Sequence, residues 1–387
     1  MTRPICGAST RPVSLQCERT FLGGGGIDIV DIAKQIVRTS LNLTDQDVLH
    51  VGAWSHTTEL ASSIAREASK VGADAWVSYY DDSLWLADFV EKDEKYLERK
   101  SPVSAHLAEI VTAQVELGGP RDPKVFDRTK PSRMSKAEAW HKEIVDRHRE
   151  RKVRSVFVGL GQVTPQRARK YGVSYPKWRR AVTAALGYDL RRLAATGQRV
   201  AKNLSGAPEV RVTAEGTDVT LSLSGRGAMV DDGIIDTEDI ARGHLHAALP
   251  VGTTSFAPVE TSAEGTVTFP TVPLWGKMIR DLEFTFRGGC LVEYRAGKNL
   301  KAFTDFYEAG SGDKDRIAWL SVGLNPKCTY VGGFVDHLVA GAASIGIGAN
   351  EEIGGANKGL FEFGGTLPRA TVQAGSVTIV DRGKLAF

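Results

Sequence analysis

Residues 47–80 set the fold class of the first half of the chain, because two short strand patterns enclose one helical pattern. The run "DVLHVGAW" (47–54) has the length and apolar content of a buried strand. The segment "TTELASSIAREASKVGA" (57–73) repeats its apolar residues at helical spacing, and Gly72 marks its end. "DAWVSYY" (74–80) follows as a second strand. This order predicts a parallel βαβ unit.

The same alternation extends to both sides of this unit. A helical pattern, "IDIVDIAKQIVRTSL" (27–41), precedes it, and the strand patterns "EIVTAQVELGG" (109–119) and "VRSVFVGLG" (153–161) follow. Residues 123–154 are basic and polar, which predicts a loop and then an exposed helix with solvated Lys and Arg. One long helix is predicted over 176–206, with Pro176 at its start and Gly206 at its end. We therefore expect an open parallel α/β sheet domain over 27–206.

After residue 207 the pattern changes from alternating elements to strands and hairpins. The segment 209–233 alternates with period two around turns at Gly216 and Gly225, and 263–297 continues in the same way. We expect a β-rich α+β domain over 207–387 that carries the cleft. Residues 1–26 end in "GGGG" and are expected to be a flexible lead-in. They do not fit a phosphate loop, which needs a preceding strand and a following Lys-Ser/Thr.

Composition excludes several classes of function. A net charge of +3 over 387 residues is near neutral, so neither nucleic acid nor a membrane surface is an expected partner. No apolar run reaches the roughly 18 residues of a membrane span, and the N-terminus lacks the apolar core of a signal peptide. The four cysteines form no Cys-x-x-Cys pair, which indicates reduced thiols in a cytoplasmic protein.

Four motifs in the second half carry a family resemblance. They are "GTDVTLSLSGR" (216–226), "DDG" (231–233), "LPVGTTSFAPVETSAEGTV" (249–267) and "SIGIGANEEIGG" (344–355). In this order they resemble the metal-dependent aminopeptidases related to aminopeptidase T, over residues 27–387. The resemblance implies two domains, a homodimer and a two-metal site in the C-terminal cleft. Its wider group includes an iron-dependent dihydroxypyridine ring-cleaving dioxygenase and a nitroanthranilate aminohydrolase, so the fold leaves the reaction open.

The metal ligands that the resemblance implies are largely missing from this chain. The family turn reads Pro-x-Gly-Glu with the Glu as a ligand, and Thr253 stands in its place. The other ligand positions fall on Trp319, Ser344 and the segment Glu362–Gly364. A neutral hydroxyl is a poor substitute for an anionic oxygen on a divalent metal. We therefore expect no cofactor, with Thr253, Trp319 and Ser344 left to contact substrate.

Three residues are candidates for acid–base chemistry. Glu362 lies among apolar residues and glycines in "GLFEFGG", surroundings that would raise its pKa and suit a general acid or base. Glu351 is the second candidate, at the position of a family tyrosine. His337 is the third, although no Gly-x-Ser-x-Gly elbow accompanies it and a surface or capping histidine is the commoner role. Glu352 and Asn357, in the glycine-rich segment 349–359, are further candidates for substrate contact.

A relocated metal site is the alternative to a metal-free one. His244 and His246 are two residues apart on an expected strand, which would point both rings to the same side. Such a pair would supply two ligands for zinc, manganese or iron. The third ligand would be Glu351, Glu352, His337 or Glu362.

Three functions from different classes therefore remain open. The first is a diverged hydrolase that acts on a small amide, arylamine or ring substrate by acid–base chemistry. The second is a metal-dependent aminopeptidase or ring-cleaving dioxygenase with a relocated ligand set. The third is a non-catalytic binding or assembly protein. Elemental analysis of purified protein would separate the first from the second.

Overall fold

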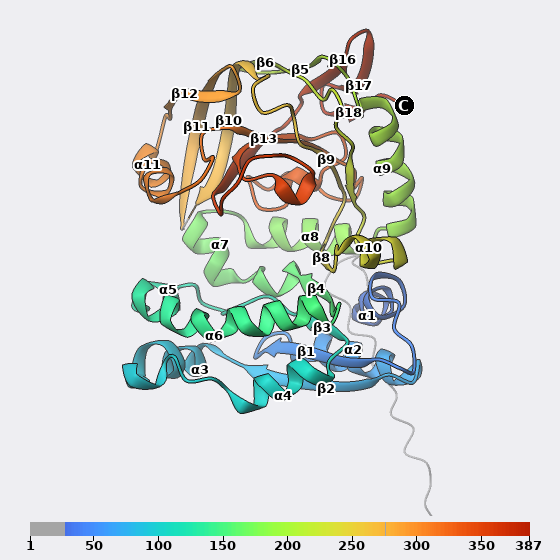
Figure 1. Ribbon diagram of the computed structural model, residues 1–387, viewed down its shortest axis with the longest axis vertical. Helices are drawn as coiled ribbons and strands as arrows, with labels where there is room; N and C mark the ends of the chain where they lie inside the picture. The colour runs from blue at the N-terminus through green and yellow to red at the C-terminus, as the bar shows by residue number, and fades with distance from the viewer. Residues whose placement is uncertain (1–27, 275) are drawn as a thin grey trace, which may run out of the picture.

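The computed structural model describes residues 28–274 and 276–387. Figure 1 shows a parallel sheet with its helices at one end of the molecule and antiparallel sheets at the other. Helices α7 (Pro165–Tyr171) and α8 (Tyr175–Leu186) lie between these two parts. The lead-in expected over 1–26, together with Cys6 and Cys17, falls outside the described residues. Cys290 and Cys328 are free thiols.

The first part confirms the expected α/β class. Its sheet has the order β2-β1-β3-β4-β8, and every neighbouring pair is parallel. The helix between the first two strands buries Leu60, Ile64 and Ala68, which share one face at helical spacing. The strands are β1 (Val48–Trp54), β2 (Asp74–Tyr80), β3 (Ala113–Glu116), β4 (Arg154–Val158) and β8 (His246–Leu249). The helices are α1 (Ile29–Gln35), η1 (Ile36–Ser40), α2 (Thr58–Lys70), α3 (Asp82–Leu86), η2 (Ala87–Glu91), η3 (Glu94–Tyr96), α4 (Pro102–Ile110), α5 (Lys124–Arg128), α6 (Pro131–Glu150) and η4 (Gly159–Gln162).

The single long helix expected over 176–206 is wrong. The structure has two helices there, α8 and α9 (Leu190–Leu204), separated by residues 187–189. The first ends at Leu186, with Gly187 as its C-cap residue. The carboxylate of Asp189 accepts hydrogen bonds from the backbone N–H groups of Arg191 at 2.9 Å and Arg192 at 3.4 Å. Because an N-cap of this kind satisfies the free donors of a new helix, the chain can change direction at this point.

Two antiparallel sheets build the second part. One has eight strands in the order β12-β11-β10-β6-β5-β16-β17-β18, and the other has five in the order β15-β14-β13-β9-β7. Buried Phe269, Phe284 and Phe303 gather with Phe363 in the core. The bounds are β5 (Val210–Ala214), β6 (Thr217–Leu221), β7 (Met229–Asp231), α10 (Thr237–Arg242), β9 (Thr253–Phe256), β10 (Glu264–Leu274), β11 (Lys277–Arg287), β12 (Cys290–Arg295), α11 (Leu300–Ala309), β13 (Ile317–Gly323), η5 (Asp336–Leu338), β14 (Ala343–Gly348), η6 (Glu351–Ile353), β15 (Glu362–Leu367), β16 (Thr371–Ala374), β17 (Val377–Asp381) and β18 (Lys384–Leu385).

One strand from the second half of the chain completes the parallel sheet, and one glycine lets α9 pack closely against β7. Strand β8 comes after residue 207 in sequence, yet it pairs with β4 at the edge of the parallel sheet. In α9, a Cβ atom at Gly197 would lie 2.4 Å from the side chain of Val230, so only glycine allows the helix to lie this close to β7. None of the helices in the described ranges has the length and apolar character that crossing a membrane requires.

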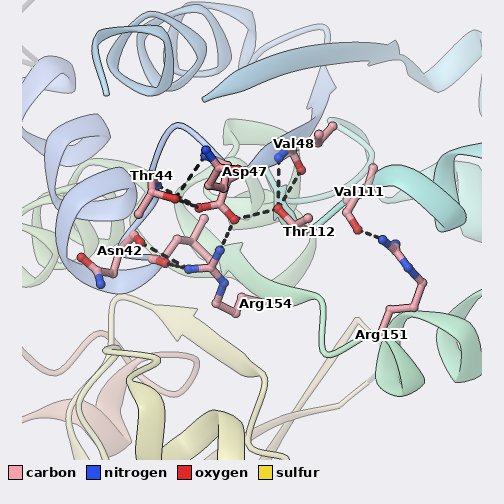
Figure 2. A network of polar contacts seen from close by, with 10 residues as sticks. Asn42, Thr44, Asp47, Val48, Val111, Thr112, Arg151 and Arg154 are labelled. Atoms are coloured by element: carbon pink, nitrogen blue, oxygen red, sulfur yellow. Dashed lines mark hydrogen bonds and ion pairs between the residues drawn. The ribbon is translucent and has the colours of Figure 1, made fainter. Parts of the chain in front are cut away.

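A buried carboxylate joins three strands at the amino-terminal edge of the parallel sheet (Figure 2). Asp47 forms an ion pair with Arg154 and accepts hydrogen bonds from the Thr44 backbone N–H at 2.8 Å and the Thr112 hydroxyl at 2.7 Å. The Thr112 hydroxyl in turn accepts from the backbone N–H of Val48 at 3.0 Å. This network connects the residues next to the starts of β1, β3 and β4.

The Thr112→Val substitution is expected to lower the free energy of unfolding by about 1–2 kcal/mol, because it removes a partner from a buried carboxylate and from a backbone N–H. Urea denaturation would measure the change. The exposed Thr58→Val variant is the control and should stay within about 0.5 kcal/mol of the parent. Equal stabilities for the two variants would contradict a structural role for this network.

Candidate functional site

A row of hydroxyls crosses one face of the five-stranded sheet. The strand register places Thr366, Ser344, Ser321 and Ser255 opposite one another on β15, β14, β13 and β9. Residues directly opposite in an antiparallel sheet point to the same side, so the four hydroxyls share a face. Ser255 and Ser321 are hydrogen-bonded at 2.7 Å, and Ser344 and Thr366 at 3.1 Å. The uncharged turn that begins β9 is therefore one end of a polar row.

Trp319 lies on the same face, because it is two residues from Ser321 along β13. Its ring covers two glycines of the neighbouring strands. A Cβ atom at Gly346 would lie 2.0 Å from Trp319 Cζ2, and one at Gly364 would lie 2.8 Å from it. These two glycines leave the space that the indole occupies.

A small hollow of about 190 Å³ opens beside this ring. It is lined by Ser255, Trp319, Ser321, Asn350, Glu352 and Glu362, among others. Partial burial raises the pKa of Glu362, and the negative charge of Glu352 raises it further. The hollow therefore combines a flat aromatic wall, two hydroxyls and a carboxylate that is a stronger base than a solvated one.

A second, larger hollow of about 520 Å³ adjoins the first, and we call it the acidic hollow. It lies among β7, α10, β8 and η6, and it shares Glu352 and Ile353 with the small hollow. Glu351, His244 and His246 also line it. Partial burial lowers the pKa of His246, and the negative charge of Glu352 partly offsets this effect.

The structure brings three of the predicted residues, Trp319, Glu352 and Glu362, into the small hollow. Thr253 and Ser344 lie on the same face of the sheet but are buried, and neither is among the residues that line the two hollows. The residues at the implied ligand positions therefore lie on one face of the sheet, although only Trp319 and Glu362 line a hollow.

The structure does not place Asn357 where it could contact substrate, although the sequence predicts such a contact. Its side chain is buried and donates to the carbonyls of Ile317 and Gly348, both at 2.9 Å. Its backbone N–H donates to the side chain of Asn350 at 2.8 Å, and Asn350 donates to the carbonyl of Ala318 at 3.1 Å. The two amides hold the loop that carries η6 in place, which positions Glu352 at the hollow.

His337 lies away from both hollows, in the short helix η5, with an exposed side chain. Its neighbour Asp336 accepts hydrogen bonds from the backbone N–H groups of Val331, Gly332 and Gly333. That carboxylate is occupied by the backbone and does not orient the imidazole. The structure gives His337 no contact with the other catalytic candidates.

The expected strand pair of His244 and His246 is wrong in one respect. Strand β8 begins at His246, and His244 belongs to the loop before it. The Nδ1 atom of His246 is hydrogen-bonded to the hydroxyl of Ser155 at 2.9 Å. The alternation of a strand therefore does not point the two rings to one side.

The residues at the implied ligand positions do not fit a two-metal site. Thr253 and Ser344 offer neutral hydroxyls, and the indole N–H of Trp319 is a donor that cannot ligate a cation. Glu362 is the single carboxylate among these positions, and Gly364 has no side chain. Within the part of the chain that the structure describes, no three His, Cys, Asp or Glu side chains are grouped so that they could hold a metal ion.

Sequence reasoning missed four residues that matter for the site and for the proposals below: Ser321 and Asn350 in the small hollow, and Asp231 and Asp232 in the acidic one. Ser321 was detectable in principle, since it follows Trp319 by two residues in a strand. Asp231 belongs to the "DDG" motif of the resemblance, but its position beside Thr253 depends on the pairing of β7 with β9. Nothing local distinguishes Asn350 from a loop asparagine.

Comparisons with known proteins identify the fold and the family of this chain. The solved structure of wild-type AmpT from Thermus thermophilus has a TM-score of 0.71 and 19% identity, covering 93% of this chain and 99% of that one. The 2,5-dihydroxypyridine dioxygenase from Pseudomonas putida KT2440 has a TM-score of 0.57 and 12% identity, covering 92% and 96%. At these identities both likenesses concern the fold alone, and no curated protein matches the sequence. A family model described as thermophilic metalloprotease (M29) matches residues 28–314, ending just before β13. The chain therefore belongs to the M29 family of thermophilic metalloproteases, as the resemblance predicted.

Proposed function

We propose that this M29 member is a hydrolase that acts on a small, flat amide, arylamine or ring substrate by acid–base chemistry, without a two-metal site. The observation that carries the proposal is the small hollow, in which the Trp319 ring, the Glu362 carboxylate and the hydroxyls of Ser255 and Ser321 meet. A volume of about 190 Å³ suits one ring rather than a peptide segment.

Glu362 is the general base of this proposal. Its carboxylate removes a proton from a water molecule while the water oxygen forms a bond to the electrophilic carbon of the substrate. The bond from that carbon to the leaving nitrogen then breaks, and the proton held by Glu362 passes to the nitrogen. The raised pKa of Glu362 favours the first transfer, because it makes the carboxylate a stronger base than a solvated one.

The serine hydroxyls and the indole have separate roles. Negative charge develops on the substrate as water adds. Ser255 and Ser321 are hydrogen-bonded to each other, which leaves one of the two hydroxyls with a proton to donate to that charge. Trp319 stacks on a flat substrate and keeps it beside Glu362. The proposal retains the homodimer that the resemblance implies and the cytoplasmic location that the cysteine content suggests.

A substrate panel tests this proposal. It contains leucine p-nitroanilide and dipeptides beside simple aryl amides and aminobenzoates, each with EDTA and with added zinc, manganese or cobalt. We expect turnover of an aryl substrate that EDTA leaves unchanged, because Glu362 rather than a metal activates water. Metal-stimulated cleavage of dipeptides at ordinary aminopeptidase rates would instead support the metallopeptidase.

A further inference from the structure

The acidic hollow carries far more negative than positive charge. Seven carboxylates and two guanidinium groups line it, together with two imidazoles. Helix α9 adds only the uncharged Gln198 and Ala201 to this wall. The carboxylates belong to Asp231, Asp232, Asp236, Glu238, Asp239, Glu351 and Glu352.

Much of this charge already has a structural partner. Asp236 and Asp239 form the capping box of α10 by accepting backbone N–H groups. Glu238 is paired with Arg242, and the other guanidinium, of Arg226, is paired with Glu260 outside the hollow at 2.5 Å. Both arginines are therefore committed to other carboxylates.

Asp231 and Asp232 are left without a cation among the described residues. Asp232 accepts one backbone N–H, from Ile234 at 2.9 Å, and Asp231 is supported by the backbone N–H of Gly233. Burial, together with the charge of Asp232, raises the pKa of Asp231 to about 7. Burial and nearby carboxylates raise the pKa of Asp232 to about 6. An ionised carboxylate in such a place is destabilised until a positive group reaches it.

The position of Asp231 links this charge to the candidate site. Strand β7 pairs with β9 so that Asp231 stands opposite Thr253, on the face that carries the row of hydroxyls. The hollow extends from Asp231 to Glu352, where it meets the small hollow. One molecule could therefore occupy both hollows, with different chemical groups in each.

We infer that the acidic hollow binds a positively charged amine or guanidinium group of the substrate, with Asp231 and Asp232 as its counter-ions. The inference deepens the proposed function, because it takes the substrate to be a flat molecule whose cationic end lies in the acidic hollow while its reacting carbon lies beside Glu362. A charged N–H donor forms stronger hydrogen bonds to these carboxylates than a neutral one. The same group offsets the repulsion between the two adjacent aspartates.

Binding of benzylamine to the full chain tests this inference without requiring catalysis. Benzylamine is positively charged at pH 8, and benzyl alcohol is its uncharged counterpart. We expect titration calorimetry at pH 8 to show benzylamine binding at least about tenfold more tightly than benzyl alcohol. The difference should shrink as the pH falls from 8 to 5, because both aspartates become protonated through pKa values of about 7 and 6.

Asp231→Asn should weaken benzylamine binding at least about tenfold, and Glu209→Gln, an exposed carboxylate remote from both hollows, should not. The asparagine resembles the protonated acid. Because the pKa of Asp231 is raised in the fold, its stabilising contribution is complete below pH 3.8 and is lost as the pH rises through about 7. At pH 8 the variant should thus be at least as stable as the parent, which excludes unfolding as the cause of weak binding.

Equal binding of benzylamine and benzyl alcohol, or unchanged binding by Asp231→Asn, would overturn the inference. Displacement of benzylamine by micromolar zinc or manganese would also overturn it, since the hollow would then be a metal site. The proposed function has a separate readout. If only the proposed function fails, benzylamine still binds but the aryl panel shows no turnover. If only this inference fails, the panel is active and benzylamine does not bind.

Discussion

The Glu362→Gln variant should lose at least about 100-fold in kcat/KM toward the best aryl substrate of the panel, because an amide cannot remove a proton from water. Glutamine keeps the size of the side chain, and residue 362 is only partly buried at the start of β15, so the fold should persist. Steady-state kinetics on the purified variant would measure the loss. Lys358→Met, which changes an exposed residue outside the small hollow, is the matched control.

The pH profile distinguishes a base from a residue that only supports the fold. A general base works in its deprotonated form, so kcat/KM of the parent should rise with pH through the raised pKa of Glu362. Glu352→Gln removes a neighbouring negative charge, and this rise should move to lower pH while activity persists. An unshifted profile in Glu352→Gln, or full activity in Glu362→Gln, would remove Glu362 from the mechanism.

Much of the fold followed from local patterns, and the two exceptions have a local and a nonlocal cause. Strand and helix periods in 47–80 correctly predicted a parallel unit, since both periods are set within a few residues. The break between α8 and α9 was missed because Gly187 is tolerated in a helix pattern, while Asp189 becomes a cap only once the chain turns. The partner of β8 is nonlocal, and no pattern in 246–249 indicates that it joins the parallel sheet.

The family resemblance predicted those site residues that match its motifs. It could not predict the residues that reach the site through the pairing of distant strands. Trp319 and Glu362 were expected at one site and lie in one hollow. The proximity of Asp231 to Thr253 depends on strand register, which a single sequence does not specify. The glycine-rich loop predicts a substrate contact for Asn357, yet the structure shows its side-chain amide donating to two backbone carbonyls. In a single sequence, a polar loop residue that stabilises the loop has the same pattern as one that contacts a ligand.

Gly346→Ala should lower the free energy of unfolding by about 2–3 kcal/mol in the parent and by less than about 1 kcal/mol in a Trp319→Ala background. The reason is geometric: the three atoms nearest to the added Cβ all belong to the Trp319 ring, at 2.0, 2.2 and 2.3 Å. The indole ring must therefore shift away from Gly346. Flat substrates should then bind more weakly, because the ring no longer lies where they stack. Chemical denaturation of the two single variants and the double variant completes the cycle. Gly119→Ala, where the added Cβ meets no atom within 4 Å, is the control. If Gly346→Ala were equally destabilising with and without the indole, the ring would not occupy the space between β13 and β15, and the flat wall on which the proposed substrate class depends would be lost.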